Sequence, residues 1–362
     1  MLLSIVTLYI YSAWAKVRTR RYFHGNTLLD GSAFEYHARP LQILAGRMIA
    51  VLLFVAVTFS GIIHPLAPIV AAVLLALIVP WAIWRSTKFN ARMSSYRNVR
   101  FGFDGGLGMM YLCVLVLPFL PLLVAGVVAG ALYLGGVGES AAGGAFAFGV
   151  LGVYALAPWK HKKLAEYLAD NHGLRRAAFA ASPSTGRFYA IYIQAFVLAI
   201  VVLVVLLVAL LGAGLAAGIS VSGAMESMGD VAGDTDTMVG LVTALLYPLF
   251  FTVGYLVTAL FRARVRNHLY ANTVIDGRVR LDSTVRTWPL WRLMMGNLLL
   301  LVFTLGLAWP WVQVRKARFF ARNTAALAPD GLHAVVDAEH ARQGALGEEL
   351  GDAFDMDMDV GF

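Results

Sequence analysis

The chain has 362 residues, of which 59% are hydrophobic and only 14% are charged, and its mean hydropathy is +0.72. A soluble domain is about 45–50% apolar and about 25% charged, so this composition excludes an ordinary soluble protein. The net charge of +8 would suggest nucleic-acid binding in a soluble chain, but its distribution, described below, favours a membrane.

Apolar runs along the chain predict membrane-spanning helices, because about 20 apolar residues cross the roughly 30 Å hydrocarbon layer. In chain order the runs are 41–63, 66–84, 107–132, 143–159, 187–218 and 238–261, with a shorter one at 1–14 and a last one near 289–311. We therefore expect an all-α polytopic membrane protein, a helical bundle of about seven or eight membrane segments.

The first run differs from a signal peptide, because its basic residues follow the apolar stretch instead of preceding it. About 13 residues reach only about 20 Å at 1.5 Å per residue, which is too short to span. Met1 is therefore expected to lie partway through a helix.

Among the connections between the apolar runs, positive charge is found only in alternate ones. Lys and Arg outnumber acids by five to two, five to one, six to two and seven to two in 15–40, 85–106, 160–187 and 262–292. The other connections contain no Lys or Arg, and one of them, "MESMGDVAGDTD", carries four acids. Because loops rich in Lys and Arg stay in the cytoplasm, we expect the basic loops inside the cell and the acidic loops in the periplasm. Anionic lipid headgroups, and not nucleic acid, are the expected partners of the basic segments.

Four tryptophans stand where an apolar run meets its basic segment: Trp14, Trp84, Trp159 and Trp311. An indole ring favours the membrane interface because one edge is apolar and the other donates a hydrogen bond. We expect these four residues to be interfacial anchors.

The sequence around the first tryptophan recurs. Trp14–Thr27 and Trp311–Thr324 share seven identities in 14 positions, and Val17–Gly31 and Ala263–Gly277 share six in 15. Such similarity indicates a structure built from repeats. Five asparagines mark the occurrences: Asn26, Asn98, Asn171, Asn272 and Asn323. In each unit the helix is expected to continue past the membrane, with its basic side chains reaching the phosphates, until the asparagine ends it.

The motif "NTLLDG" returns as "NTVIDG" and predicts a helix end followed by a β-hairpin. The residues concerned are Asn26, Thr27, Asp30, Gly31, Asn272, Thr273, Asp276 and Gly277. Asn and Thr side chains bond nearby backbone groups outside helices. An Asp-Gly pair flanked by apolar, β-prone residues is the strongest short hairpin signal. We expect two small cytoplasmic hairpins, and their pairing into a shared sheet would offset the marginal stability of each.

The last apolar run breaks the alternation, because one run instead of two separates Asn272 from Trp311. Either 289–311 enters and returns on the cytoplasmic side, or it crosses and leaves the C-terminus outside. The cations after Trp311 favour the first alternative. The chain is thus divided into a membrane domain, 1–325, and an acidic tail, 326–362, whose composition predicts disorder.

The stretch "YSAWAKVRTRRYFHGNTLLDGSAFEYHARPLQILAGR" closely resembles the opening motif of the YjgN-like family of bacterial inner-membrane proteins of unknown function. The resemblance extends over most of the chain. It implies an inner-membrane location and a multi-pass architecture, and it implies no reaction.

Motifs that carry chemistry are absent from the sequence. The eight histidines include no HExxH pair and have no close cysteine partner, and neither a nucleophile elbow nor a P-loop occurs. We predict no enzyme activity, no cofactor and no metal. Gln194 and Asn297 are the strongly polar residues expected deep in the membrane, whereas ion-coupled transporters place acids or histidines there.

Two hypotheses for function follow. The first is a carrier or pore for a small or lipid-like solute, since many transporters are built from repeats. The alternative is a membrane scaffold whose cytoplasmic hairpins bind a protein partner, a second copy or anionic lipid. A cavity that reaches Gln194 or Asn297 would favour the carrier, and exposed hairpin edges would favour the scaffold.

Overall fold

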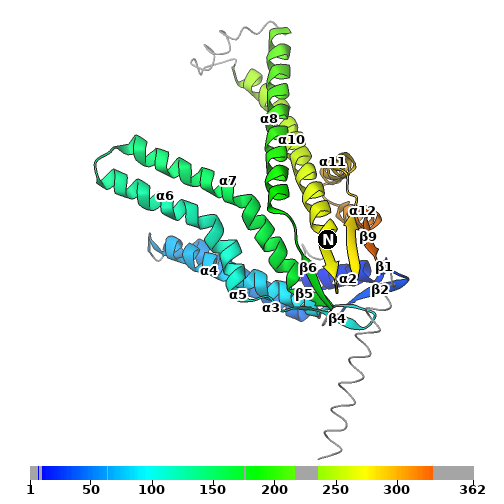
Figure 1. The fold of residues 1–362 in the computed structure, drawn as a ribbon. Helices are drawn as coiled ribbons and strands as arrows, with labels where there is room; N and C mark the ends of the chain where they lie inside the picture. The colour runs from blue at the N-terminus through cyan, green and yellow to red at the C-terminus, as the bar shows by residue number, and fades with distance from the viewer. Residues whose placement is uncertain (1–6, 8–9, 63, 175–176, 217–234, 329–362) are drawn as a thin grey trace, which may run out of the picture. The chain divides into compact units, whose positions relative to one another are not determined.

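The computed structural model describes residues 7, 10–62, 64–174, 177–216 and 235–328, and long helices alternate in it with short strands (Figure 1). The helices are α2 Ser12–Gly25, α3 Pro40–Phe59 with the 3-10 turn η1 Ser60–Ile62, α4 Ala67–Arg92, α5 Leu107–Tyr111, the π-helical η2 Leu112–Val116, α6 Leu117–Leu134, α7 Glu139–Asp170, α8 Thr185–Ala216, α10 Thr235–Ala271, α11 Thr287–Phe303 and α12 Trp309–Arg322.

Among the described residues, five helices are long and apolar enough to cross a membrane: Pro40–Ile62, Ala67–Arg92, Leu107–Leu134, Glu139–Asp170 and Thr185–Val208. They match the first five full-length runs predicted from sequence. The sixth run, 238–261, lies within α10, whose side chains are described only from Phe250 onward. The first run, 1–14, lies mostly outside the described residues.

The strands correct the prediction of an all-α fold. In the described part of the chain they are β1 Leu28–Leu29, β2 Ser32–Tyr36, β3 Ser94–Tyr96, β4 Val99–Phe103, β5 His172–Leu174, β6 Ala177–Ala181, β7 Thr273–Ile275, β8 Val279–Ser283 and β9 Thr324–Leu327. They form one sheet in chain order, β1 to β9, and the pairs from β1–β2 to β7–β8 are antiparallel. The predicted tail boundary at residue 326 therefore falls inside β9, and the tail from 329 onward lies outside the described residues.

Both predicted Asp-Gly hairpins are present, as β1–β2 and β7–β8. Asp30 and Gly31 have φ angles of 48° and 71°, and Asp276 and Gly277 have 52° and 69°. These left-handed angles at both central residues match the twist of the flanking strands, which is why Asp-Gly is favoured there.

Substitution of Gly277 is expected to separate backbone strain from packing. Gly277→Val should lower the free energy of unfolding by about 1–2 kcal/mol, because a side chain with a branched Cβ is strained at positive φ. Gly277→Asn should lower it much less, since Asn tolerates this conformation. No atom lies within 4 Å of a Cβ built on Gly277, so steric contact does not contribute. Thermal unfolding in detergent measures both variants, and equal losses would contradict the turn assignment.

One of the five asparagines was assigned to the wrong place in its repeat. Helix α4 ends at Arg92 with Met93 as its C-cap, so Met93 holds the position of Asn26. Asn98 instead lies in the β3–β4 turn with φ 64°, next to Arg97 with φ 47°. Asn replaces Gly in this turn because its short polar side chain tolerates the left-handed region.

At the other repeats, Asn and Thr side chains end the helix as predicted. The amides of Asn26, Asn171 and Asn323 donate to the carbonyl oxygen four residues earlier over 2.7, 2.8 and 2.7 Å. The hydroxyls of Thr27, Thr273 and Thr324 donate in the same way over 2.7, 2.7 and 2.6 Å. Each bond satisfies a carbonyl that the last turn of a helix leaves without a partner.

One backbone hydrogen bond recurs at every pair of helices. The N–H that follows each hairpin donates to the carbonyl of the residue that ends the returning helix: His37 to Met93 at 2.8 Å, Asp104 to Asn171 at 3.0 Å, Ser182 to Asn272 at 3.1 Å and Thr284 to Asn323 at 3.1 Å. The pairs α3–α4, α5–α7, α8–α10 and α11–α12 therefore each leave the strands and return to the place where they began.

The fourth pair is much shorter than the others. Helices α11 and α12 have 17 and 14 residues, which gives about 25 and 21 Å, less than the roughly 30 Å of a crossing. Leu305 and Gly306, with φ 48° and 85°, turn the chain between them. Leu290 of α11 packs in one cluster with Phe319 and Phe320 of α12, so the two helices run antiparallel. The same cluster includes Ala259 and Ala263, so the α11–α12 hairpin packs against α10.

The chain divides by its contacts into two units. The first holds the sheet and the helices α2 to α7, and the second, Gly186–His268 and Ser283–Thr324, holds α8, most of α10, α11 and α12. The core of the sheet is formed by Tyr96, Val99, Leu174, Ala177 and Val279. Leu29 of β1 and Ala326 of β9 both pack against this core. The sheet therefore curves until strands from its two ends share one apolar centre.

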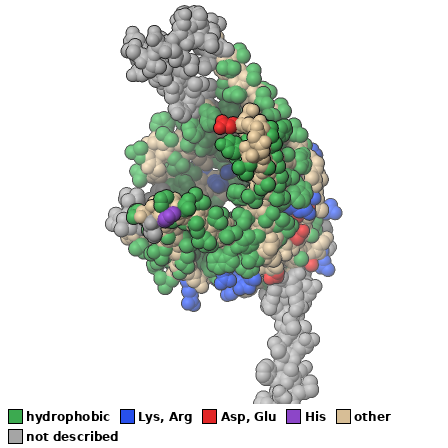
Figure 2. All heavy atoms as spheres, turned by 90° about the vertical axis from the view of Figure 1, so that its left-hand side faces the viewer, with side chains coloured by type: hydrophobic (Ala, Val, Ile, Leu, Met, Phe, Trp, Pro, Cys, Tyr) green, Lys and Arg blue, Asp and Glu red, His purple; other side chains and the backbone are tan. Residues whose placement is uncertain are grey.

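The five candidate spans leave most of their surface uncovered by the described part of the chain. The five candidate spans bury only 0–17% of their most apolar window inside the protein. Figure 2 shows hydrophobic side chains over most of the visible surface of the described residues. Such exposed apolar surface is typical of contact with lipid or with another chain.

Candidate functional site

The four predicted interfacial tryptophans have different surroundings. Trp14 and Trp311 are 38% and 68% exposed, as a lipid-facing anchor requires. Trp159 is half-buried in α7. The indole Nε1 of Trp84 donates to the Gly105 carbonyl over 2.7 Å, so this residue also ties α4 to the loop after β4. No sequence motif indicated that second role.

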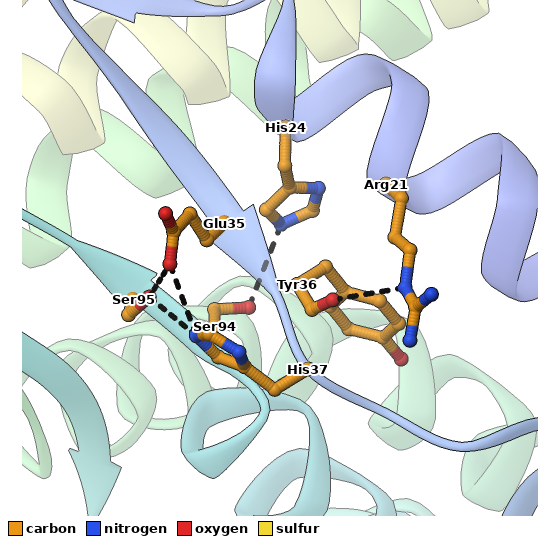
Figure 3. A network of polar contacts seen from close by, with 7 residues as sticks. All are labelled: Arg21, His24, Glu35, Tyr36, His37, Ser94 and Ser95. Carbon is orange, nitrogen blue, oxygen red and sulfur yellow. Dashed lines mark hydrogen bonds and ion pairs between the residues drawn. The ribbon is translucent and has the colours of Figure 1, made fainter. Parts of the chain in front are cut away.

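A polar network surrounds the first hairpin, where α2 lies against β2 and β3 (Figure 3). Arg21 Nε donates to the Tyr36 carbonyl over 3.3 Å, and Ser94 Oγ lies 3.5 Å from His24 Nε2. His37 Nε2 is 2.7 Å from Ser95 Oγ. No sequence motif links these histidines to their partners, because the residues come from segments about 60–70 positions apart.

Glu35, His37 and Ser95 are the residue types of a nucleophilic triad, but their geometry differs from one. The carboxylate Oε2 of Glu35 lies 3.5 Å from His37 Nε2, the same nitrogen that contacts the serine. A triad needs the acid on the opposite ring nitrogen, where it fixes the tautomer and orients the ring. Ser95 is also only 1% exposed, so a substrate could not reach it. These contacts brace β2 against β3.

His24 is held in one neutral tautomer. Its Nδ1 lies 2.9 Å from the Arg20 carbonyl, which only accepts, so Nδ1 carries the proton and Nε2 accepts. Burial lowers the pKa of His24 below its ordinary value. The bond to the Arg20 carbonyl raises this pKa, and the charge of Arg20 lowers it again.

The lowered pKa of His24 predicts a loss of stability in mild acid. Below about pH 6.5 the unfolded chain binds a proton at this histidine that the folded chain does not, so unfolding becomes easier as pH falls. His24→Gln keeps a donor and an acceptor and removes the titration. The melting temperature of the wild type should therefore fall more than that of the variant between pH 7.5 and 5.5. Identical slopes would show that His24 does not couple folding to pH.

Arg47 is a charged residue that the sequence analysis passed over, although it lies inside the first candidate span. Its Nη1 donates to the Ser12 hydroxyl of α2. Lys16 lies one turn further along α2, and its pKa is lowered by burial first and then by the charges of Arg20 and Arg47. Two cations therefore lie close together where α2 meets the first candidate span. An arginine within an apolar run was the signal that could have identified this pair.

The two polar residues predicted to lie deep in the membrane have opposite surroundings. Gln194 is exposed on α8, whereas Asn297 of α11 is only 8% exposed. The Asn297 Oδ1 atom has no hydrogen-bond partner among the residues that the structure describes. A buried acceptor without a partner costs about 1–3 kcal/mol.

Asn297→Leu is therefore expected to stabilise the protein by about 1 kcal/mol, because it removes the unpaired acceptor and keeps a similar volume. The melting temperature in detergent measures the change. Gln194→Leu, a matched change at an exposed position, should leave it nearly unaltered. A destabilised Asn297→Leu variant would show that the amide makes a bond that stabilises the fold.

No group of three or more His, Cys, Asp or Glu residues in the described ranges could hold a metal ion. The polar groups around the first hairpin join α2, β2 and β3 through the contacts described above.

Comparison with known proteins gives one family. A family model with the description "Bacterial protein of unknown function (DUF898)" matches residues 1–353. The "Inner membrane protein YjgN" of Salmonella typhimurium is 25% identical over 338 residues, which cover 89% of this chain and 82% of that protein. The protein of the same name from Escherichia coli K12 is 26% identical over 121 residues, 33% of this chain and 30% of that protein. No solved structure matches the chain significantly.

Proposed function

Because the chain belongs to the DUF898 family of bacterial proteins, as the resemblance to YjgN-like proteins predicts, we propose that it is an inner-membrane scaffold. In this proposal a cytoplasmic sheet holds helical hairpins that enter the membrane from it. The recurring backbone bond, from His37 to Met93 through Thr284 to Asn323, carries the proposal. It ties both ends of every helical pair to the strands, while the spans themselves bury few residues.

The charge distribution supports the cytoplasmic side for the sheet. The basic segments 15–40, 85–106, 160–187 and 262–292 contain the first eight strands, and positively charged loops remain inside. With α10 as the sixth crossing, the five candidate spans and α10 cross the membrane six times. The α11–α12 hairpin enters and returns.

Anionic headgroups at the cytoplasmic leaflet are the proposed partners, with a protein partner or a second copy as further ones. Arg47 and Lys16 support the lipid partner, because their charges lie close together at the boundary of the first span. Each Lys or Arg near an anionic surface contributes about 1 kcal/mol to binding. The scaffold is proposed to have neither enzyme activity nor a cofactor.

A carrier for a lipid-like solute is the second candidate. The apolar, weakly buried surfaces of the spans favour it, since they can contact the acyl chains of a lipid. A polar solute is less suited, because Gln194 is exposed and Asn297 is enclosed, so they do not line a common path in the described residues.

A lipid-scrambling assay separates the two candidates. The protein is reconstituted in vesicles that contain a fluorescent phospholipid, and dithionite is added outside to bleach the outer leaflet. The scaffold predicts that dithionite bleaches the same fraction of the fluorescence as in protein-free vesicles, about half. Bleaching of much more than half of the fluorescence would replace the scaffold with a lipid carrier.

A further inference from the structure

A pocket of about 530 Å³ lies at the end of the α11–α12 hairpin, within the size range of ligand sites. It is lined by Leu300 and Thr304 of α11, Leu307 and Ala308 of the turn, and Trp311 and Arg315 of α12. Nearly all of the lining is apolar. An apolar pocket with one cation at its side fits a ligand that has an apolar chain and an anionic group.

The polar groups of the pocket differ in whether they are already used. The Thr304 hydroxyl donates to the Leu300 carbonyl over 2.6 Å and accepts from the Ala308 N–H over 3.1 Å. Arg315 is exposed and makes no hydrogen bond or ion pair with any residue in the described ranges. Its guanidinium lies close to α11, with Nη2 3.7 Å from a Cβ built on Gly296. Arg315 is thus held beside the pocket with its charge available.

The surface around the pocket has the composition of a membrane boundary. Five large apolar residues at the hairpin end are exposed by 46–92%: Phe303, Leu305, Leu307, Trp309 and Trp311. Arg315, Lys316, Arg318 and Arg322 are exposed along α12. Exposed aromatic and apolar side chains next to a basic helix face are typical of helices that lie in the lipid headgroup layer.

We propose that this pocket binds one anionic phospholipid, with an acyl chain between α11 and α12 and the headgroup phosphate at Arg315. Guanidinium binds phosphate with two parallel N–H donors, which a single unpaired arginine can supply. The site makes the proposed lipid partner of the scaffold more specific, and its assignment to the cytoplasmic leaflet rests on the proposed function. The site would bind lipid whether or not the protein also transports a solute.

Photocrosslinking in vesicles tests the site without reference to orientation. Wild-type protein is reconstituted in phosphatidylcholine that contains a few percent of phosphatidylglycerol with a diazirine in one acyl chain. After illumination, labelled peptides are mapped by mass spectrometry. Labelling is expected within 300–311 and is expected to fall severalfold when the same diazirine chain is carried by phosphatidylcholine.

Two matched variants test the role of the charge. Arg315→Gln should reduce labelling of 300–311 severalfold, whereas Arg318→Gln, the same change on the same helix away from the pocket, should not. Both residues are exposed, and size-exclusion elution checks that both variants fold. Soluble glycerophosphoglycerol, which has no chain, should not compete.

Equal labelling of the two variants, equal labelling by the two lipids, or full competition by the soluble headgroup would each overturn the proposal. The last result would leave a site for a free anion. None of these outcomes affects the scrambling assay, so failure of the lipid site and failure of the scaffold can be told apart.

Discussion

An Ala345→Cys variant in a Cys113→Ala background is expected to remain unlabelled when intact cells are treated with a maleimide that does not cross the inner membrane. The reason is the fourth helical pair, which begins and ends at the Thr284–Asn323 bond and is too short to cross. Moving the cations of α12 outward would also oppose the membrane potential, at about 2.3 kcal/mol per charge per 100 mV. Labelling should therefore change from absent to complete after the membrane is permeabilised.

Controls make this result interpretable. A periplasmic reporter fused after Gly229, in the acidic connection, should be active, and one fused after Asp104 or Gly277 should not. Labelling of residue 345 without permeabilisation would make 289–311 a crossing and place the tail outside. Reversed reporter activities would contradict the orientation of the whole chain.

Val99→Asp is expected to abolish the folded protein, with a loss of about 4 kcal/mol or more in the free energy of unfolding. Val99 is 1% exposed at the centre of the sheet core, and a carboxylate there would be buried without a partner. Because the sheet fixes both ends of each helical pair, the damage should extend to the spans. The yield of monodisperse protein after extraction in detergent measures it.

Asn98→Asp is the matched control for this variant. It introduces the same carboxylate one residue away, at an exposed turn position with φ 64° that Asp also tolerates. Its yield should equal that of the wild type. A similar loss in both variants would mean that added negative charge, and not burial, causes the defect.

Local chemistry decided which hairpins could be predicted. Asp-Gly at 30–31 and 276–277 has a strong intrinsic preference for the turn it forms. The β3–β4 turn uses Arg97 and Asn98, a pair with a weaker preference, and Asn98 was read as a helix end. Strand β6, "AAFAA", consists mainly of alanine, which is depleted in strands. Its place in the sheet comes from pairing with β5 and β7, which a single sequence does not reveal.

The membrane segments were predictable wherever length and apolar composition act alone. The run near 289–311 was ambiguous because its turn depends on positive φ at Leu305, a residue that gives no such signal. The exposure of Gln194 and the enclosure of Asn297 depend on which helix faces meet. Arg315 was predicted only to snorkel after Trp311, since the pocket beside it forms from two helices and a turn together.

The order of the strands also bears on how the chain is made. Since β1 to β9 lie in the sheet as they occur in the sequence, every strand pairs with one synthesised just before or soon after it. Each pair of helices can enter the membrane and close its backbone bond at the sheet before the next pair leaves the ribosome. Apart from the outer edge of β1, only the newest strand then exposes an unpaired edge, which limits aggregation of nascent chains. The protein can thus be inserted one repeat at a time, from the N-terminus to the C-terminus.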